Sequence, residues 1–353
     1  MTRIIKYTEA INEALHEAMA QDESVLLFGL GVDDPKRIFA TTAQLVERFG
    51  SERVFDMPTA ENAMTGIGIG ASLLGFRPVM VHQRLDFFLL AMDQLVNNAA
   101  KWYFMFGGQK SVPITIRLVT GRGWGQGPTH SQNLHAWFAH IPGLKVVMPA
   151  FPADAKGMLL SAIFDDNPVI VIEHRWVHAL EGEVVNGDWR IPLGKGRVVT
   201  SGDALTIVAL SYMTIEALHA VEQLKQDGIY CELIDLRSIQ PLDWELIFTS
   251  VKKTGRLLAL DIAATSFSVA SELVARCAIE LFADLKCPPR KLALPDCPVP
   301  TSFGLTKGFY ITAVDIVETV GAMLNCPVPG AERLRAAQTT PHDVPGEWFK
   351  GPF

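Results

Sequence analysis

Short apolar runs that alternate with longer helical patterns constrain the fold of this chain more than any other feature. Six runs of three to seven residues, rich in valine and isoleucine, lie between residues 25 and 172 and predict strands. The segments between them have the longer apolar spacing of helices, so the pattern indicates βα units and a doubly wound, mainly parallel sheet. The expected strands are 25–29, 54–57, 77–81, 113–119, 146–148 and 168–172, and the expected helices are 7–20, 60–74, 86–105, 131–140 and 152–164.

The rhythm stops after residue 176 and resumes at residue 204, which predicts two α/β domains, 1–176 and a smaller one at 204–329. We interpret 177–203 as a connection because it has scattered Trp, Gly and Pro. The tail 330–353 carries Trp348, Phe349 and Phe353 on a Pro/Gly-rich segment, which suggests docking onto a partner or packing on its own chain. In the second domain we expect strands at 204–210, 231–236, 257–261 and 291–294, and helices at 215–227, 243–254 and 268–282.

Composition excludes several classes of protein. The net charge of −7 gives no basic surface for nucleic acid or an anionic membrane. No apolar stretch is long and uncharged enough to span a bilayer, and the N-terminus lacks the apolar block of a signal peptide, so we expect a cytoplasmic protein. The five cysteines form no CxxC pair, and their odd number argues against a disulfide framework.

Two polar residues at expected loop–helix junctions are candidates for proton transfer. Glu61 precedes the glycine-rich run 66–71, and a carboxyl group buried among such small residues can hold a proton at neutral pH. His130 precedes Ser131-Gln132, and an imidazole exchanges protons near physiological pH. Each residue is expected to open a helix directly after a loop, where side chains tend to line a cleft. A capping or solvated role is the simpler alternative for both.

Other motifs near these residues carry weaker signals. The run 66–71 fits a loose G-x-G-x-x-A, but it does not follow a strand directly and no acidic residue trails it at the right distance. We therefore expect its small residues to let a helix pack closely, and nicotinamide binding is a minor alternative. Histidines 130, 135 and 140 do not share a helical face, so they predict no metal site. Gln83 and Phe87 flank Asp86 at a strand–helix junction and could line a ring-shaped ligand.

Taken in order, these motifs resemble the β subunits of the thiamine-diphosphate-dependent 2-oxo acid dehydrogenases, in the transketolase-like superfamily. These are the decarboxylase components of the pyruvate, branched-chain and acetoin dehydrogenase complexes. The resemblance extends from about residue 4 to residue 325 and implies a pyrimidine-binding domain followed by a transketolase C-terminal-like domain. It rests on segments 58–71, 91–101, 107–108, 130–132, 142–147, 154–157 and 166–169.

The resemblance implies roles for individual residues. Glu61 matches the glutamate that hydrogen-bonds N1′ of the cofactor's aminopyrimidine ring, beside Thr59 in the same motif. Phe87 matches the aromatic residue packed on that ring, and Gln83 a polar residue beside it. His130 matches the histidine that assists the reaction with the lipoyl group. A structural monovalent cation such as K⁺ is implied at the positions of Ile114, Ala162, Ile163, Asp165 and Asn167.

The chain also departs from the family pattern. It has Val81-His82-Gln83-Arg84 where many members carry an acidic residue just before the glutamine. Asp261-Ile262-Ala263-Ala264-Thr265 replaces the usual glycine-rich turn of the second domain. These differences concern the substrate and the partner in the complex more than the fold.

Half of the expected cofactor site is missing from the sequence. Family members hold the diphosphate through Mg²⁺ with a Gly-Asp-Gly segment followed about 30 residues later by Asn-Asn. Neither Gly187-Asp188-Trp189 nor Gly202-Asp203-Ala204 is followed by such a pair, and Asn97-Asn98 lies upstream of both. We therefore expect a separate α subunit to supply the Mg²⁺ site, in an α2β2 heterotetramer with the active site at the interface.

The expected reaction is oxidative decarboxylation of a 2-oxo acid, or cleavage of acetoin, with acyl transfer to a lipoyl group. The sequence does not name the substrate or decide whether a lipoyl acyltransferase core is a partner. One alternative is half of a split transketolase-like enzyme with an aldehyde acceptor. The other is a catalytically silent scaffold subunit, against which the presence of both Glu61 and His130 argues.

Overall fold

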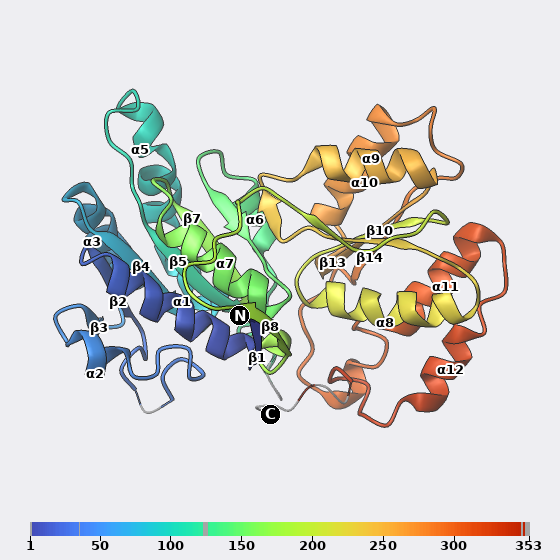
Figure 1. Cartoon of the computed structure of the whole chain (residues 1–353), viewed down its shortest axis with the longest axis horizontal. Coiled ribbons are helices and arrows are strands. Elements are labelled where there is room, and N and C mark those ends of the chain that lie inside the picture. The colour runs from blue at the N-terminus through green and yellow to red at the C-terminus, as the bar shows by residue number, and fades with distance from the viewer. Residues whose placement is uncertain (1, 35, 123–125, 347–348, 350–353) are drawn as a thin grey trace. The chain divides into compact units, whose positions relative to one another are not determined.

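The computed structural model describes residues 2–34, 36–122, 126–346 and 349, which form two compact units (Figure 1). The first unit comprises the described residues of Met1–Arg122, Thr129–Leu193 and Ile239–Pro241. The second comprises those of Gly123–Pro128, Gly194–Ser238 and Leu242–Phe353. In Figure 1 the first unit runs mainly from blue to green and the second from yellow to red.

A seven-stranded sheet in the order β12-β6-β7-β5-β4-β2-β3 forms the centre of the first unit. Every pairing from β6 to β3 is parallel, which confirms the predicted mainly parallel, doubly wound sheet. The strands β4, β5 and β7 consist almost entirely of buried residues, as parallel strands covered on both faces require. The strands are β2 (Val25–Gly29), β3 (Val54–Asp56), β4 (Arg77–His82), β5 (Thr115–Thr120), β6 (Lys145–Val147), β7 (Val169–His174) and β12 (Ser238–Gln240).

The helices of this unit follow the expected order with one broken segment. The stretch predicted as a single helix over 86–105 consists of α4 (Leu85–Phe88), the 3₁₀ turn η1 (Leu89–Ala91), the π-helical η2 (Gln94–Ala99) and α5 (Ala100–Met105). The predicted helix 131–140 is shorter and begins later. The remaining helices are α1 (Tyr7–Gln21), α2 (Leu45–Phe49), α3 (Glu61–Leu73), α6 (His135–Ala139), α7 (Pro152–Ile163) and the 3₁₀ turn η3 (Arg175–Val177).

Close packing of α3 against the sheet depends on one glycine. A Cβ atom at Gly68 would lie 2.9 Å from Ile114 Cδ1 and 3.2 Å from Phe28 Cζ. A Cβ atom at Gly70 would meet nothing within 4 Å, and one at Gly66 only the side chain of Gln94 at 3.5 Å. The small-residue run therefore serves close helix packing, as expected, mainly through Gly68, whose neighbours are the side chains of Phe28 on β2 and Ile114 just before β5.

The stretch interpreted as a connection contains two strands that the sequence pattern did not predict. Strand β8 (Glu181–Val185) pairs antiparallel with β1 (Thr2–Lys6) as a separate two-stranded sheet of the first unit. Strand β9 (Arg197–Thr200) pairs antiparallel with a strand of the second unit. These strands are mostly half-exposed, so they lack the apolar run that marks a buried strand.

The second unit is built on a five-stranded sheet in the order β14-β13-β10-β11-β9, parallel except for β9. Helix α12 follows the Pro327–Pro329 segment and packs on α8 and α11 (Figure 1). Arg333 of α12 bonds Gln223 and Asp227, so the first part of the predicted tail is a helix packed on its own unit. The elements are β10 (Thr206–Ala209), β11 (Glu232–Asp235), β13 (Leu257–Ala264), β14 (Arg290–Leu294), α8 (Tyr212–Gln226), α9 (Trp244–Thr254), α10 (Val269–Glu280), the 3₁₀ turn η4 (Phe303–Leu305), α11 (Ala313–Leu324) and α12 (Gly330–Ala337).

The rest of the tail is described in part. His342 lies against Phe303, with ring centroids 4.1 Å apart, and its Nε2 is 2.9 Å from the Phe303 carbonyl oxygen. Trp348 and Phe353, which suggested docking, lie outside the described residues, while Phe349 is buried. Across the described ranges, no helix combines the length and apolar character needed to cross a membrane.

Candidate active site

The predicted site residues follow three strands of the first unit, β3, β4 and β5. Because the strands are parallel, their carboxyl ends meet at one edge of the sheet, in the order β5, β4, β2, β3. Thr59 and Glu61 follow β3, Gln83 and Phe87 follow β4, and His130 lies in the loop after β5. Three interstrand spacings separate β3 from β5, which is roughly 14 Å. Glu61 and His130 therefore belong to the same edge of the sheet, on loops three strand spacings apart.

Glu61 is the first residue of α3, as the sequence predicts, and only 7% of its surface is exposed. Its backbone carbonyl accepts a hydrogen bond from the Thr65 hydroxyl at 2.8 Å. No residue in the described part of the chain donates a hydrogen bond to its carboxylate. A nearly buried carboxyl group at a helix N-terminus is stabilised by the helix dipole and remains able to bond a ligand. Thr59, two residues earlier, is exposed.

Gln83 and Phe87 lie on the segment that connects β4 to α4. A Cβ atom added to Gly31 would lie 2.2 Å from Gln83 Nε2, so the Gln83 amide lies over the glycine backbone after β2. Gly31 has φ +79°, a conformation that glycine adopts without strain. Phe87 is half-buried, and its ring meets the imidazole of His130 edge-on with centroids 5.3 Å apart. The structure thus brings together two of the predicted site residues from different strands.

His130 does not open a helix. It lies in the turn at residues 128–130, its side chain is exposed, and α6 begins five residues later at His135. Its Nδ1 is 3.0 Å from the Thr129 hydroxyl. The expected junction is wrong because residues 131–134 are held outside the helix by contacts with other elements, among them Asp86 and Thr120. An exposed imidazole beside an aromatic ring is free to exchange protons with a ligand.

A buried network of charges that the sequence pattern did not reveal lies within the same sheet. Arg117 of β5 donates to both carboxylate oxygens of Glu173 on β7, at 2.7 and 3.1 Å. Burial would raise the pKa of Glu173, but Arg117 and the contact with His178 outweigh it and lower that pKa to about 2. His178 is fully buried, and burial lowers its pKa to about 4. Sequence spacing gave no signal for this pair, because its partners are 56 residues apart.

The five residues expected to hold a monovalent cation lie at the opposite edge of this sheet, before β5 and β7. Arg77 donates to the carbonyl oxygens of Ile163 and Asp165 at 3.3 and 3.0 Å, and Lys145 pairs with the Asp165 carboxylate. The Ile114 carbonyl accepts from Val169, and that of Ala162 from the Asp165 amide. The segments are therefore close together, but a metal ion would share its oxygens with the chain's own cations.

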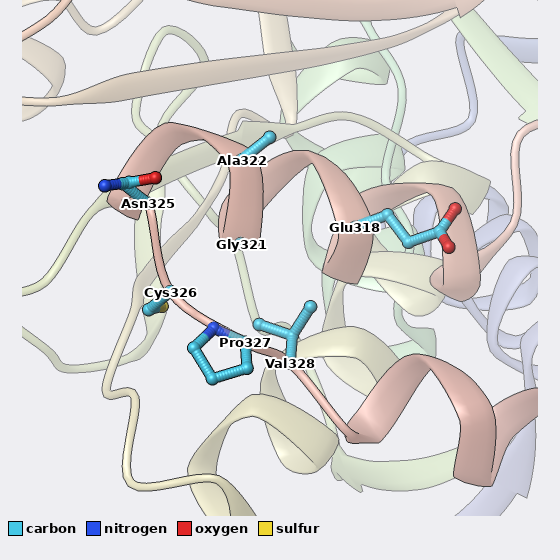
Figure 2. A pocket seen from close by; sticks show the side chains of 7 residues that line it. All are labelled: Glu318, Gly321, Ala322, Asn325, Cys326, Pro327 and Val328. Atoms are coloured by element: carbon cyan, nitrogen blue, oxygen red, sulfur yellow. The ribbon is translucent and has the colours of Figure 1, made fainter.

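Two surface hollows contain none of these residues. One, of about 480 Å³ in the second unit, lies between the end of α11 and the segment Cys326–Val328 that turns back beneath it (Figure 2). Its Glu318 carboxylate is paired with Arg335. The other, of about 840 Å³ in the first unit, is lined by β1, α1 and α2, and its charges largely pair with one another, as Arg3 does with Glu13. Neither contains any of the predicted site residues, although Cys326 lines the first and His16 the second.

Comparison with known proteins finds a family match for each of the two units. Residues 3–177 match the family model "Transketolase, pyrimidine binding domain", and residues 194–316 match "Transketolase, C-terminal domain". A solved structure described as "Split gene transketolase, inactive beta4 tetramer" superposes with a TM-score of 0.74. It covers 91% of this chain and 98% of the other at 24% identity, which establishes likeness of fold alone.

Curated relatives are considerably more similar in sequence. The chain is 38% identical to the acetoin:2,6-dichlorophenolindophenol oxidoreductase subunit beta of Bacillus subtilis, over 93% of this chain and 99% of the relative. It is also 38% identical to the 2-oxoisovalerate dehydrogenase subunit beta of that organism, over 89% and 97%. The pyruvate dehydrogenase E1 component subunit beta of Rhizobium meliloti is 37% identical over 89% of this chain and 69% of the relative.

These relatives favour the expected dehydrogenase subunit over the split transketolase, the silent scaffold and the nicotinamide enzyme. They confirm the resemblance that the ordered motifs indicated. The chain belongs to the family of β subunits shared by the acetoin, 2-oxoisovalerate and pyruvate dehydrogenases, which combine a transketolase pyrimidine-binding domain with a transketolase C-terminal domain.

Proposed function

We propose that this chain is the β subunit of a thiamine-diphosphate-dependent enzyme that oxidatively decarboxylates a 2-oxo acid or cleaves acetoin. The acyl group would pass to a lipoyl group, and the active site would be shared with an α subunit. Family membership supports this proposal. The single observation that carries it is the carboxylate of Glu61, which is nearly buried, accepts no hydrogen bond from the described residues and lies on the same sheet edge as Phe87 and His130.

The residues at this edge fit the aminopyrimidine half of the cofactor. The Glu61 carboxyl group would share a hydrogen bond with ring nitrogen N1′, for which its unpaired oxygens are suited. Phe87 would pack on the ring, and Gln83 and Thr59 would contribute polar groups beside it. Thiamine diphosphate supplies the electron sink for decarboxylation when bound. His130, exposed at the other end of the edge, would then move a proton during transfer to the lipoyl acceptor.

The diphosphate half of the site is proposed to come from the α subunit. No Asn-Asn follows either Gly-Asp segment in the sequence. The Asn97 and Asn98 amides donate to Asp93, just before their π-helical segment, and to Gln94, its first residue. Within the described ranges, no three His, Cys, Asp or Glu side chains gather where they could hold a metal ion. We therefore assign Mg²⁺ to the α subunit, in a heterotetramer of two α and two β chains.

Co-expression with the neighbouring reading frame tests this proposal. We expect 2-oxo acid decarboxylation with thiamine diphosphate and Mg²⁺ only in the mixture, and we expect calorimetry to detect weak or no cofactor binding to this chain alone. Tight stoichiometric binding to the isolated chain would contradict the split site. A stable complex without activity towards 2-oxo acids or acetoin would favour a scaffold, and activity only with an aldehyde acceptor would favour the transketolase-like alternative.

The role of Glu61 is tested in the same assembly. Glu61→Gln removes the ionisable carboxyl group while it keeps the side-chain shape, so we expect turnover to be nearly abolished and assembly to persist. Glu52→Gln is the matched control, because Glu52 is exposed and lies in the same region of the chain. Unchanged turnover of the Glu61→Gln complex would exclude the catalytic assignment.

A further inference from the structure

The carboxylate of Asp86 is bonded to the segment that directly follows the turn carrying His130. Asp86 lies in α4, one residue before Phe87, and only 8% of its surface is exposed. Its Oδ1 accepts two hydrogen bonds from Gln132, one from the backbone amide at 3.3 Å and one from Nε2 at 2.8 Å. Gln132 is two residues after His130, so a single carboxylate oxygen ties α4 to the turn. Hydrogen bonds to an ionised acceptor are stronger than neutral ones.

Gln132 is also held from the neighbouring strand. The Thr120 hydroxyl, at the end of β5, lies 2.6 Å from the Gln132 carbonyl oxygen and 2.8 Å from Asn133 Oδ1. Strands β4 and β5 are adjacent in the sheet, so both sides of the Gln132 backbone are bonded to the same rigid edge. Residues 131–134 belong to neither a helix nor a strand, and these bonds tie the segment to β5 and α4.

The position of the His130 ring depends on this arrangement. Within the described residues, the ring has one hydrogen-bond partner, the Thr129 hydroxyl beside it, and one ring partner, the edge of Phe87. Neither contact would hold the turn if the bonds to Gln132 were lost, because Thr129 moves with His130 and the contact between the rings is worth little alone.

The other oxygen of the Asp86 carboxylate lacks a hydrogen-bond partner among the described residues. Asp86 Oδ2 and the Ser131 hydroxyl oxygen are both buried and have no hydrogen-bond partner among the described residues. Burial of an unpaired polar atom costs folding free energy. Features that oppose stability in this way concentrate at functional sites, where geometry is selected over stability. The unpaired oxygens therefore indicate that Asp86 is present for the placement of the turn.

We propose that Asp86 is a positioning residue that acts through Gln132 to hold the His130 imidazole against Phe87 for the transfer step. The inference rests on the proposed function of His130. If Asp86 acts only as a positioning residue, its removal should matter only as far as His130 does.

A double-mutant cycle in the assembled holoenzyme tests this dependence. We expect Asp86→Ala to slow transfer to the lipoyl acceptor by about 10- to 100-fold, the range that loss of one or two charge-assisted hydrogen bonds gives. We expect Asp86→Asn, which keeps the Oδ1 acceptor, to recover most of that rate. In the His130→Ala background, Asp86→Ala should add less than about a twofold loss. A full additional loss in that background would overturn the proposal, since it would mean that Asp86 does not act through His130.

Hydrogen exchange on the isolated chain tests the clamp independently of activity. The Gln132 amide donates to Asp86, so Asp86→Ala should accelerate exchange in the segment around Gln132 by more than tenfold. Asp93→Ala is the matched control, because Asp93 accepts a bond from Asn97 but is exposed. Equal exchange in wild type and Asp86→Ala would overturn the proposal. If the wild-type assembly transfers nothing to a lipoyl group, the proposed function fails, and the exchange result still decides whether the clamp exists.

Discussion

Replacement of His82 by leucine should stabilise this protein, and more so in acid. His82 ends β4, immediately before Gln83, and is completely buried. Both ring nitrogens lack a hydrogen-bond partner among the described residues, and the ring packs on Phe88 with centroids 5.0 Å apart. An unsatisfied buried polar group costs about 1–3 kcal/mol. His82→Leu fills a similar volume without polar atoms, so we expect a gain in that range at pH 7.5.

Titration of the same residue makes the gain depend on pH. Burial lowers the pKa of His82 from 6.5 to about 4. Between these values the unfolded chain binds a proton that the folded chain does not, so stability is lost as pH falls through this window. With those two pKa values, His82 removes about 2 kcal/mol from the folded state between pH 7.5 and pH 5. His82→Leu removes this loss, and its stabilisation should be about 2 kcal/mol larger at pH 5.

Urea unfolding of the chain at the two pH values measures this difference. His140→Leu is the control, because it makes the same substitution at an exposed histidine. An equal stabilisation by His82→Leu at pH 7.5 and pH 5 would refute the titration argument. A loss of stability at pH 7.5 would contradict the premise, because it would mean that the His82 ring makes a stabilising hydrogen bond in the folded protein.

Three further predictions concern the sites described above. His130→Ala should slow transfer to the lipoyl acceptor more than the initial decarboxylation, measured in separate half-reactions, and equal losses would indicate a broader role. Arg117→Met should destabilise the chain by about 3–5 kcal/mol in urea unfolding, because it leaves Glu173 buried without its ion-pair partner. Arg117→Met/Glu173→Leu should recover most of that loss, and no recovery would exclude an unpaired charge as the cause. Replacement of choline by K⁺ at constant ionic strength should raise Tm by a few degrees. An unchanged Tm would mean that Arg77 and Lys145 neutralise the loop around Asp165 without a metal ion.

Local pattern was sufficient for six of the seven strands of the first sheet, all but β12, and for the start of α3. The apolar run at Val25–Gly29 is long enough to define a buried strand from its residues alone, and the structure has that strand with the same bounds. Glu61 opens a helix as expected, because an acidic residue in the first turn favours that position. The ordered motifs were also enough to indicate the family, since several together are far more specific than one.

The same local reasoning was wrong where distant residues decide the conformation. The segment after His130 has helical composition, but Gln132 is bonded to Asp86, 46 residues earlier, and to Thr120, so α6 begins later. The segment 86–105 reads as one helix, but its backbone changes to a π-helical pattern at Gln94–Ala99. Strands β8 and β9 form through pairing with other strands and carry little apolar signal of their own.

The sequence by itself therefore determined the alternation of elements, the family and the identity of the candidate residues Glu61, Gln83, Phe87 and His130. These follow from local periodicity and from motifs that are contiguous in the chain. Only the tertiary structure decided how the residues come together. The order of strands places Phe87 beside His130, pairs Arg117 with Glu173 and brings Asp86 within hydrogen-bond distance of Gln132. Such contacts depend on which strands are neighbours in the sheet, and strand order leaves no trace in local spacing because it is fixed by long-range packing.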